Sequence, residues 1–257
     1  MGLTRWLDYS ALEIKGDSYL ANVRRAEAWE VRREMSKIGK PPDHDEWHMT
    51  PPTVNAYYDQ KNNEIVFLAG ILQPPFFSDK VDDAVNYGGI GMVIGHEITH
   101  GFDDQGRQYD ARGNLENWWT PTDLTSFQKI ADAVSEQFSG YSVADGLKIN
   151  GKLVLGESLA DLGGLRLAYQ AYERSLQGKP RLALDDFTPE QRFFLGYARI
   201  WAMGMRPEFE RLQVNTDAHP HPKWRVNGPL SNLEEFSAAF ACKPGCPMMR
   251  STRNRLW

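Results

Sequence analysis

The chain has 257 residues, which is enough for one large domain or for two lobes. Hydrophobic residues make up 41% of the composition and the net charge is -5, so the chain lacks the basic excess expected of a nucleic-acid-binding protein. Its apolar runs are shorter than a membrane span and no signal peptide is expected at its start, so the sequence leaves the cellular compartment undetermined.

The first predicted element is a long helix over residues 9–38. Apolar residues recur in it at spacings near three and four, which is typical of an amphipathic helix, and a glycine- and proline-containing segment over residues 39–43 ends it. Its charged residues also recur at helical spacing and predict a face of ion pairs. These residues are Arg24, Arg25, Arg32, Arg33, Glu27, Glu30 and Glu34.

Two short β-rich segments follow, over residues 53–58 and 64–69. They flank a polar stretch, so they predict a β-hairpin with its loop at residues 59–63. A protein that binds an extended peptide commonly adds it to an exposed strand edge, and the 53–58 strand is the candidate for such an edge. A strand with a purely structural role is equally compatible with the sequence.

The rest of the chain is predicted to be largely helical, with helices over residues 84–104, 121–142, 154–176, 188–205 and 231–241. The helix over residues 188–205 has a defined start, because Thr188-Pro189-Glu190-Gln191 is a capping-box pattern with proline in the first turn. The predicted fold class is therefore mainly α with a small β-element (α+β).

Residues 96–100 have the sequence His-Glu-Ile-Thr-His, the pattern HExxH. Positions i and i+4 of a helix share a face, so His96 and His100 can bind one metal ion. Glu97 points about 100° away around the helix and can act as a base on a water held by that metal. The pattern also occurs by chance on surface helices. The apolar residues before His96 favour a buried helix, however, and buried polar groups need a partner.

A catalytic zinc site needs a third protein ligand. The compact pattern HExxHxxGxxH is excluded, because Asp103 and Gly106 stand where it requires glycine and histidine. Glu157 and Asp161 are four residues apart in a segment rich in leucine and small residues, so they share a helical face. We expect Glu157 to bind the metal and Asp161 to accept a hydrogen bond from a ligand imidazole. The other interpretation is a solvated face that carries two acids.

Taken together, these motifs resemble the neprilysin-like zinc endopeptidases of family M13, which include bacterial PepO-type enzymes. The resemblance is carried by the HExxH segment and by residues 54–58, 65–67, 71–77, 117–120, 156–164, 191–194 and 216–219. The stretches cover nearly the whole chain in the family order, with one departure at Leu68, where the family usually has proline. Family members are much longer, and this chain resembles only their C-terminal, zinc-bearing part.

The resemblance implies a thermolysin-like gluzincin catalytic lobe over residues 1–257 that binds one Zn²⁺ per chain through His96, His100 and Glu157. It also implies that the large N-terminal region, which covers the cleft in the family, is absent. We therefore expect an open cleft that admits flexible protein segments as well as short peptides. The uncovered apolar surface is expected to allow self-association. Family members are often extracytoplasmic or secreted, and some bacterial ones are cytoplasmic.

Further site residues are implied by the resemblance alone. The Asn55 side chain and the Ala56 backbone would anchor the main chain of the substrate. His219, oriented by Asp217, would stabilise the oxyanion, and Arg225 would hold a substrate carbonyl. The pocket for the residue after the scissile bond would be apolar, which favours cleavage before bulky residues such as Phe or Leu. Its lining would be Ile71, Phe76, Met92, Val93, Ile200 and Trp201.

The remaining histidines and the cysteines have no assigned role. His44 and His48 lie in a polar loop, and His221 is predicted to lie in a proline-rich loop facing away from the site. Cys242 and Cys246 flank a Lys-Pro-Gly turn, and no second pair completes a thiolate metal site. A local disulfide and two free thiols are both compatible with this spacing. In the family, a cysteine at the position of Cys242 can pair with one in the N-terminal region.

The sequence thus predicts a zinc-dependent endopeptidase in which Glu97 transfers the proton, assisted by Asp161 and His219. The alternative is a catalytically silent peptide-binding remnant that needs a missing N-terminal half. The presence of Glu97 favours the enzyme, because a remnant has no need for a carboxylate beside the metal.

Overall fold

The computed structural model describes residues 7–256 of the chain. The chain divides into two compact units, Met1–Pro51 and Pro52–Trp257. The HExxH motif lies in the second unit. No helix in the described part of the chain is long and apolar enough to cross a membrane.

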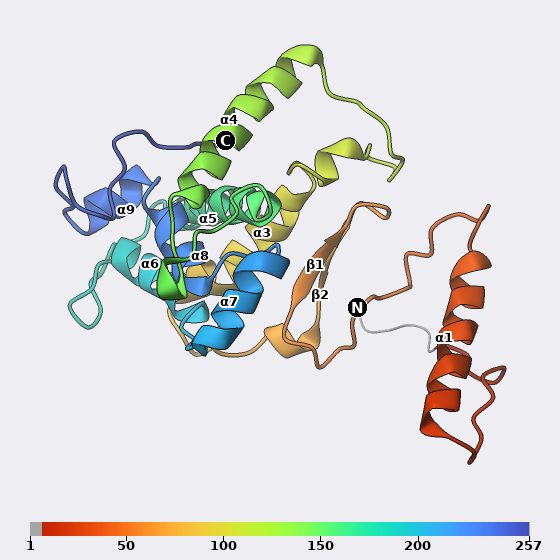
Figure 1. The fold of residues 1–257 in the computed structure, drawn as a ribbon. Helices are drawn as coiled ribbons and strands as arrows, with labels where there is room; N and C mark the ends of the chain where they lie inside the picture. Colours follow the sequence, from red (N-terminus) through yellow and green to blue (C-terminus); the bar gives the residue numbers. More distant parts are fainter. Residues whose placement is uncertain (1–6, 257) are drawn as a thin grey trace. The chain divides into compact units, whose positions relative to one another are not determined.

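The described part of the first unit contains the helix α1 (Tyr19–Met35), shown in red in Figure 1. It starts later than predicted, because Ser18 is its N-cap and accepts a hydrogen bond from the first turn. Residues 9–17 are not helical, and the ring of Tyr9 packs on that of Trp29 with centroids 5.1 Å apart. The apolar spacing of this stretch therefore does not mark helical turns.

The predicted ion-pair face of α1 is confirmed for Arg33. Its guanidinium lies 2.5 Å from a carboxylate oxygen of Glu30 and 2.6 Å from one of Glu34. Arg25 instead pairs with Asp17, which precedes the helix, at 2.7 Å. The acids in these pairs are about half exposed, so solvent screens the pairs and they contribute little to stability.

The second unit begins with the predicted hairpin. β1 (Ala56–Asp59) and β2 (Glu64–Phe67) are antiparallel, with Ala56 opposite Phe67 and Asp59 opposite Glu64. Both strands are shorter than predicted, and residues 53–55 precede the ladder. Among the described residues β1 pairs only with β2, so its other edge has no strand partner.

The remainder of the second unit is helical, which confirms the predicted fold class (Figure 1). The helices are α2 (Asp83–Asn86), α3 (Met92–His100), α4 (Pro121–Ser139), α5 (Leu155–Ser175), α6 (Pro189–Ile200), α7 (Pro207–Thr216), α8 (Pro222–Leu230) and α9 (Glu234–Ala239). A π-helical turn over residues 87–91 joins α2 to α3 without a break. α6 starts at the capping box predicted for Thr188 and Gln191.

Two helices, α7 and α8, were not predicted from the sequence. Both begin with proline, Pro207 and Pro222. The sequence analysis predicted a proline-rich loop around Pro222 and assigned no element at Pro207. Proline is compatible with the first helical position, because the N–H that it lacks has no partner there in any case. The predicted helix over residues 188–205 was also too long. It ends at Ile200, and the next helix begins at Pro207.

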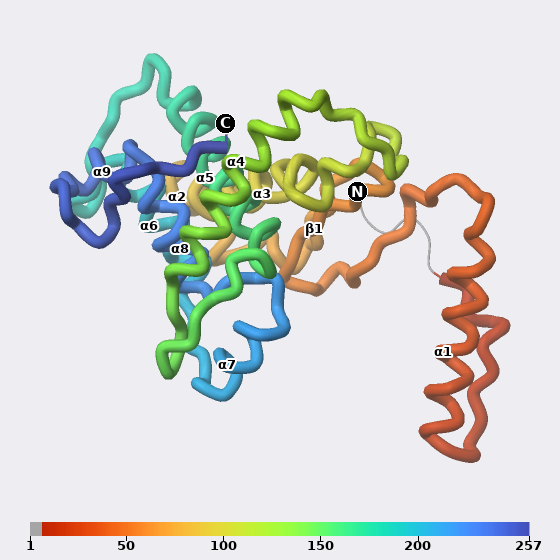
Figure 2. The backbone as a smooth tube through the Cα atoms, turned by 45° about the horizontal axis from the view of Figure 1, so that its top comes forward, coloured from red at the N-terminus to blue at the C-terminus, as the bar shows by residue number. Residues whose placement is uncertain are grey.

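Helix α5 is the centre of the second unit. It contacts α3, α4 and α8, and Figure 2 shows it running among them. One hydrophobic cluster joins α5 to α6 through aromatic rings, including Tyr169, Tyr172, Phe193 and Phe194. A second cluster joins its other side to α4. Because α5 is packed on both sides, the carboxylates in its first two turns are held at fixed positions.

The contact between α3 and α5 is a direct backbone contact at two glycines. A Cβ atom added to Gly164 would lie 2.4 Å from the backbone nitrogen of His96, and one added to Gly95 would lie 2.6 Å from the carbonyl oxygen of Gly164. Neither distance leaves room for a methyl group. The two glycines therefore set the separation between the helix that carries the histidines and the helix that carries Glu157.

We expect Gly164→Ala to lower the free energy of unfolding by about 3 kcal/mol, at the upper end of typical overpacking costs, because backbone atoms must move. Gly91→Ala is the matched control, since its added Cβ would lie 3.5 Å or more from its neighbours. Its free energy of unfolding should stay within about 1 kcal/mol of the unmodified chain. Urea unfolding of both variants measures the difference, and equal losses would contradict the proposed close contact.

Candidate metal centre

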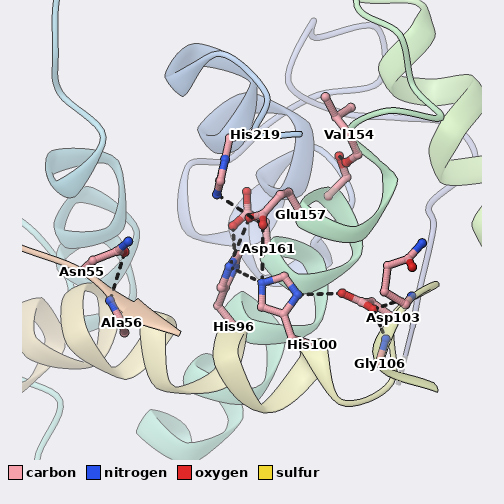
Figure 3. A network of polar contacts seen from close by, with 12 residues as sticks. Asn55, Ala56, His96, His100, Asp103, Gly106, Val154, Glu157, Asp161 and His219 are labelled. Atoms are coloured by element: carbon pink, nitrogen blue, oxygen red, sulfur yellow. Dashed lines mark hydrogen bonds and ion pairs between the residues drawn. The ribbon is translucent and has the colours of Figure 1, made fainter. Parts of the chain in front are cut away.

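The two histidines of HExxH face each other on α3 in the arrangement that a shared metal requires. Their Nε2 atoms are 3.0 Å apart, and their rings are nearly perpendicular (Figure 3). Glu157 approaches from α5, with one carboxylate oxygen 3.3 Å from Nε2 of His96 and the other 3.6 Å from Nε2 of His100. A tetrahedral zinc ion with bonds of about 2.1 Å separates its ligand atoms by about 3.4 Å. The three side chains therefore form a donor set that fits zinc.

A carboxylate orients each imidazole of the pair. Nδ1 of His96 lies 2.9 Å from a carboxylate oxygen of Asp161, and Nδ1 of His100 lies 2.6 Å from one of Asp103. A hydrogen bond at Nδ1 leaves Nε2 free to bind a metal and fixes the ring plane. The structure thus brings Asp161 to one of the two ligand imidazoles, as predicted, and it supplies a second acceptor, Asp103, for the other.

Asp103 is the site residue that the sequence reasoning missed. It is 4% exposed, and the backbone N–H groups of Gln105 and Gly106 donate to its other oxygen at 2.8 and 2.7 Å. It follows His100 by three residues, a spacing that places two side chains on one face of a helix. This spacing could have identified it, but position 103 was considered only as the place where the compact zinc motif requires glycine.

Arg225 binds Glu157, a proposed metal ligand, and Asp161, which orients another. Its Nε and Nη2 donate to the two oxygens of Asp161 at 2.8 and 2.7 Å, and Nη2 also donates to Glu157 at 3.2 Å. Its guanidinium carbon lies 4.0 Å from the ring centroid of Trp201. The buried arginine thus positions both acids of α5. Its predicted contact with a substrate carbonyl stays a prediction.

The electrostatics of the site favour ionised carboxylates around a protonated imidazole. Burial alone lowers the pKa of His96, but hydrogen bonds with Asp161 and Glu157 outweigh burial and raise this pKa to about 10. Burial alone would raise the pKa of Glu157, but the hydrogen bond with His96 and the charge of Arg225 lower it overall. A metal-binding imidazole is neutral, so zinc binding at this site must release a proton.

Glu97 lies beside the two histidines but has a different environment from Glu157. One of its carboxylate oxygens is within 4.8 Å of a ring nitrogen of each histidine, and the residue is 5% exposed. Burial raises the pKa of Glu97, and the charges of His96 and His100 offset this effect only in part. A carboxylate with a raised pKa is a stronger base, as proton transfer from water requires.

His219 faces the same centre from the segment between α7 and α8. Its Nε2 lies 3.3 Å from a carboxylate oxygen of Glu157 (Figure 3). Its Nδ1 lies 2.7 Å from a carboxylate oxygen of Asp217. The side chain is 52% exposed, unlike the metal ligands. It can therefore contact a molecule that enters from solvent.

The predicted substrate-binding residues differ from one another in exposure. Asn55 is exposed just before β1, and its Oδ1 accepts the backbone N–H of Ala56 at 3.0 Å. Four of the six predicted pocket residues are buried in the core cluster, and the other two are partly buried against it. The buried residues are Ile71, Met92, Val93 and Ile200, and the partly buried ones are Phe76 and Trp201. Their contact with a substrate side chain stays a prediction.

The remaining histidines and the cysteines are not part of the donor set. His44 and His48 belong to the first unit. His221 is not in a loop interior as predicted but forms the N-cap of α8. Cys242 and Cys246 are free thiols, the second of the two alternatives that the sequence left open.

Comparison with known proteins agrees with this geometry. Residues 55–256 match peptidase family M13. The chain belongs to this family. The resemblance to neprilysin-like enzymes is thereby confirmed, and the family character supports zinc as the metal of the site.

Two relatives show how much of a longer protein this chain matches. The chain is 45% identical to an endothelin-converting enzyme homolog of Locusta migratoria over 252 residues, covering 97% of this chain and 34% of the relative. It is 44% identical to human endothelin-converting enzyme 1 over 253 residues, covering 97% of this chain and 32% of the relative. The chain therefore spans about a third of the length of these relatives.

Solved structures give the same result. The fold matches that of Mycobacterium tuberculosis zinc metalloprotease ZMP1 in complex with an inhibitor, with a TM-score of 0.93 and 44% identity, covering 99% of this chain and 40% of that chain. It also matches PepO from Lactobacillus rhamnosis, with a TM-score of 0.83 and 36% identity, covering 98% of this chain and 39% of that one. The M13 catalytic fold is thus present in this chain.

Proposed function

We propose that this chain is the catalytic part of a zinc-dependent endopeptidase, with one zinc ion held by His96, His100 and Glu157. The observation that carries the proposal is the convergence of these three side chains, with mutual contacts of 3.0–3.6 Å. The buried carboxylate of Glu97 beside them is what a peptide hydrolase needs and a structural metal site does not.

A bound zinc ion would lower the pKa of a water ligand and polarise the carbonyl of the scissile peptide bond. Glu97 takes a proton from the attacking water and later delivers it to the leaving amine. With its Nδ1–H held by Asp217, the doubly protonated ring of His219 would donate a hydrogen bond from Nε2 to the oxygen that becomes negative in the transition state. Asp161 and Asp103 keep the two imidazoles in orientation, and Arg225 holds Asp161.

The substrate is proposed to be an extended peptide or a flexible protein segment. The edge of β1 that has no strand partner among the described residues offers a place for it, next to Asn55 and Ala56. A bulky hydrophobic residue after the scissile bond is the proposed preference, because the candidate pocket side chains, from Ile71 to Trp201, are apolar.

The test is zinc content and peptide turnover measured on the same preparation. We expect about one zinc per chain and cleavage of peptides on the amino side of Phe or Leu. A chelator should abolish the cleavage, and added zinc should restore it. Zinc binding without any turnover would support the alternative of a silent peptide-binding remnant. A chain that binds no zinc would overturn the proposed site.

We expect His219→Ala to reduce kcat about 10²- to 10³-fold with little change in KM, because its contact strengthens only in the transition state. Zinc affinity should not change, since His219 is not a proposed ligand. Steady-state kinetics with one peptide measures the two constants separately. The control is His44→Ala in the first unit. A change in KM alone would make His219 a substrate-binding residue.

A further inference from the structure

The position of His219 depends on a five-residue segment, residues 217–221, that joins α7 to α8. At its start, Asp217 accepts hydrogen bonds from both the backbone N–H and the ring of His219. The carbonyl of His219 lies 3.5 Å from the side-chain amide of Gln213 on α7. These contacts orient the ring relative to α7, so the ring can be placed accurately only if α7 and the end of the segment are themselves fixed.

His221 fixes the end of the segment. Its Nδ1 accepts the backbone N–H of Lys223 at 3.1 Å and so caps the N-terminus of α8. An acceptor nitrogen carries no proton, so in the neutral ring the proton is on Nε2. Nε2 lies 3.4 Å from a carboxylate oxygen of Glu210 on α7. Both side chains are less than a fifth exposed, at 17% and 18%, so this is not a solvated surface pair.

Glu210 in turn binds the segment of residues 141–144. Its second oxygen accepts the backbone N–H of Ala144 at 3.0 Å. The same segment holds α8, because Trp224 donates to the carbonyl of Ser142 at 2.8 Å and stacks on Tyr141 with ring centroids 4.0 Å apart. Residues 141–144 are therefore a common anchor for α7 and α8, and Glu210 with His221 connects the two helices directly.

Glu210 and His221 also line a cavity next to His219. His219, His221 and Glu210 line one small cavity together with Val154, which precedes the helix that carries Glu157. Movement of Glu210 or His221 would therefore change the wall against which the His219 segment rests.

We propose that His221 and Glu210 are positioning residues that hold His219 at its place beside the metal centre. The inference rests on the proposed peptidase function, because it assigns the pair an effect on the oxyanion donor of that reaction. An oxyanion donor acts only from a narrow range of positions, and a displacement of about 1 Å costs about 10²-fold in rate. This role was not predicted from the sequence, since His221 was expected to face away.

The effect should act on His219 and not on Arg225, although His221 caps α8, the helix that carries Arg225. Arg225 is buried and bound to Asp161 and Glu157, so it keeps its position when the cap is lost. His219 is half exposed and depends on its own segment. Loss of the pair should therefore lower kcat and leave zinc affinity unchanged.

The kinetic test uses His221→Ala and Glu210→Gln, with Glu208→Gln as the matched control on the same helix, where Glu208 is 76% exposed. We expect each test variant to lose about 10- to 100-fold in kcat, with KM and zinc affinity within about twofold. In the His219→Ala background the same changes should cost nothing further, because they act through the missing ring. His221→Asn keeps a capping acceptor but is too short for Glu210, so its loss should be smaller than that of His221→Ala.

A second readout does not depend on activity. Nitrogen-15 NMR of the histidine rings should show His221 protonated at Nε2, and Glu210→Gln should shift the ring resonances of both His221 and His219. Unchanged His219 resonances, or full additivity of the kinetic losses with His219→Ala, would overturn the inference. If the unmodified chain binds zinc but cleaves no peptide, the proposed function fails, and the NMR result alone then decides whether the pair holds the ring of His219.

Discussion

Glu97→Gln is expected to retain zinc and to lose nearly all hydrolysis, about 10³- to 10⁴-fold in kcat. The range is the upper part of that typical of general-base catalysis. Glutamine preserves the volume and the hydrogen-bonding shape of the side chain but cannot accept the proton of the attacking water. Burial raises the pKa of Glu97, so the unmodified carboxylate is well suited to take this proton. The measurement is peptide turnover together with zinc content.

The controls for Glu97 separate the chemistry from the fold. Glu136→Gln makes the same change on the exposed side of α4 and should leave turnover unaltered. Glu97→Asp keeps the carboxylate but withdraws it by one methylene, so part of the activity should remain. If Glu97→Gln kept more than a tenth of the unmodified turnover, the base would have to be another residue.

Glu157→Ala should lose zinc, because two imidazoles alone leave the ion under-coordinated. The carboxylate of Glu157 lies 3.3 and 3.6 Å from the two Nε2 atoms and is the only side chain proposed to complete the set. Its removal should weaken zinc binding by more than the 10- to 100-fold that is typical when an outer partner of a ligand is lost. Competition with a chelator of known affinity measures the dissociation constant.

The comparison for Glu157 is Asp161→Asn, which changes an outer partner. It should weaken zinc by about 10- to 100-fold, since the amide can still contact His96. Asp161→Ala is unsuitable for this purpose, because it leaves the buried guanidinium of Arg225 without its main partner. That loss costs about 3–5 kcal/mol of stability. Equal zinc affinities for Glu157→Ala and Asp161→Asn would contradict the ligand assignment.

Neighbouring positions along one helix allowed much of the site to be predicted. His96 and His100 are four residues apart on α3, and Glu157 and Asp161 are four residues apart on α5, so helical geometry alone places each pair on one face. Asp103 was within reach of the same reasoning, three residues after His100, but it lies in the turn beyond α3, where the helical pattern stops.

Two helices in the last third of the chain begin with proline and were not predicted. Pro222 was placed in a loop and no element was predicted at Pro207, whereas each opens a helix. A proline marks either the interior of a loop or the first turn of a helix, and the residues around it do not always distinguish the two. For this reason α7 and α8, which position His219 and Arg225, were absent from the predicted fold.

The sequence by itself determined the fold class, the family resemblance and the zinc chemistry, and it predicted which residue acts as the base. All of these depend on residues a few positions apart or on motifs in a fixed order. Only the tertiary structure decided how α3 meets α5 at Gly95 and Gly164, and which acid each imidazole contacts. It also decided that Arg225 binds Asp161, 64 residues away, and that His221 reaches Glu210. Such pairings depend on how whole helices pack, and the local pattern of a chain does not encode which face of one helix meets another.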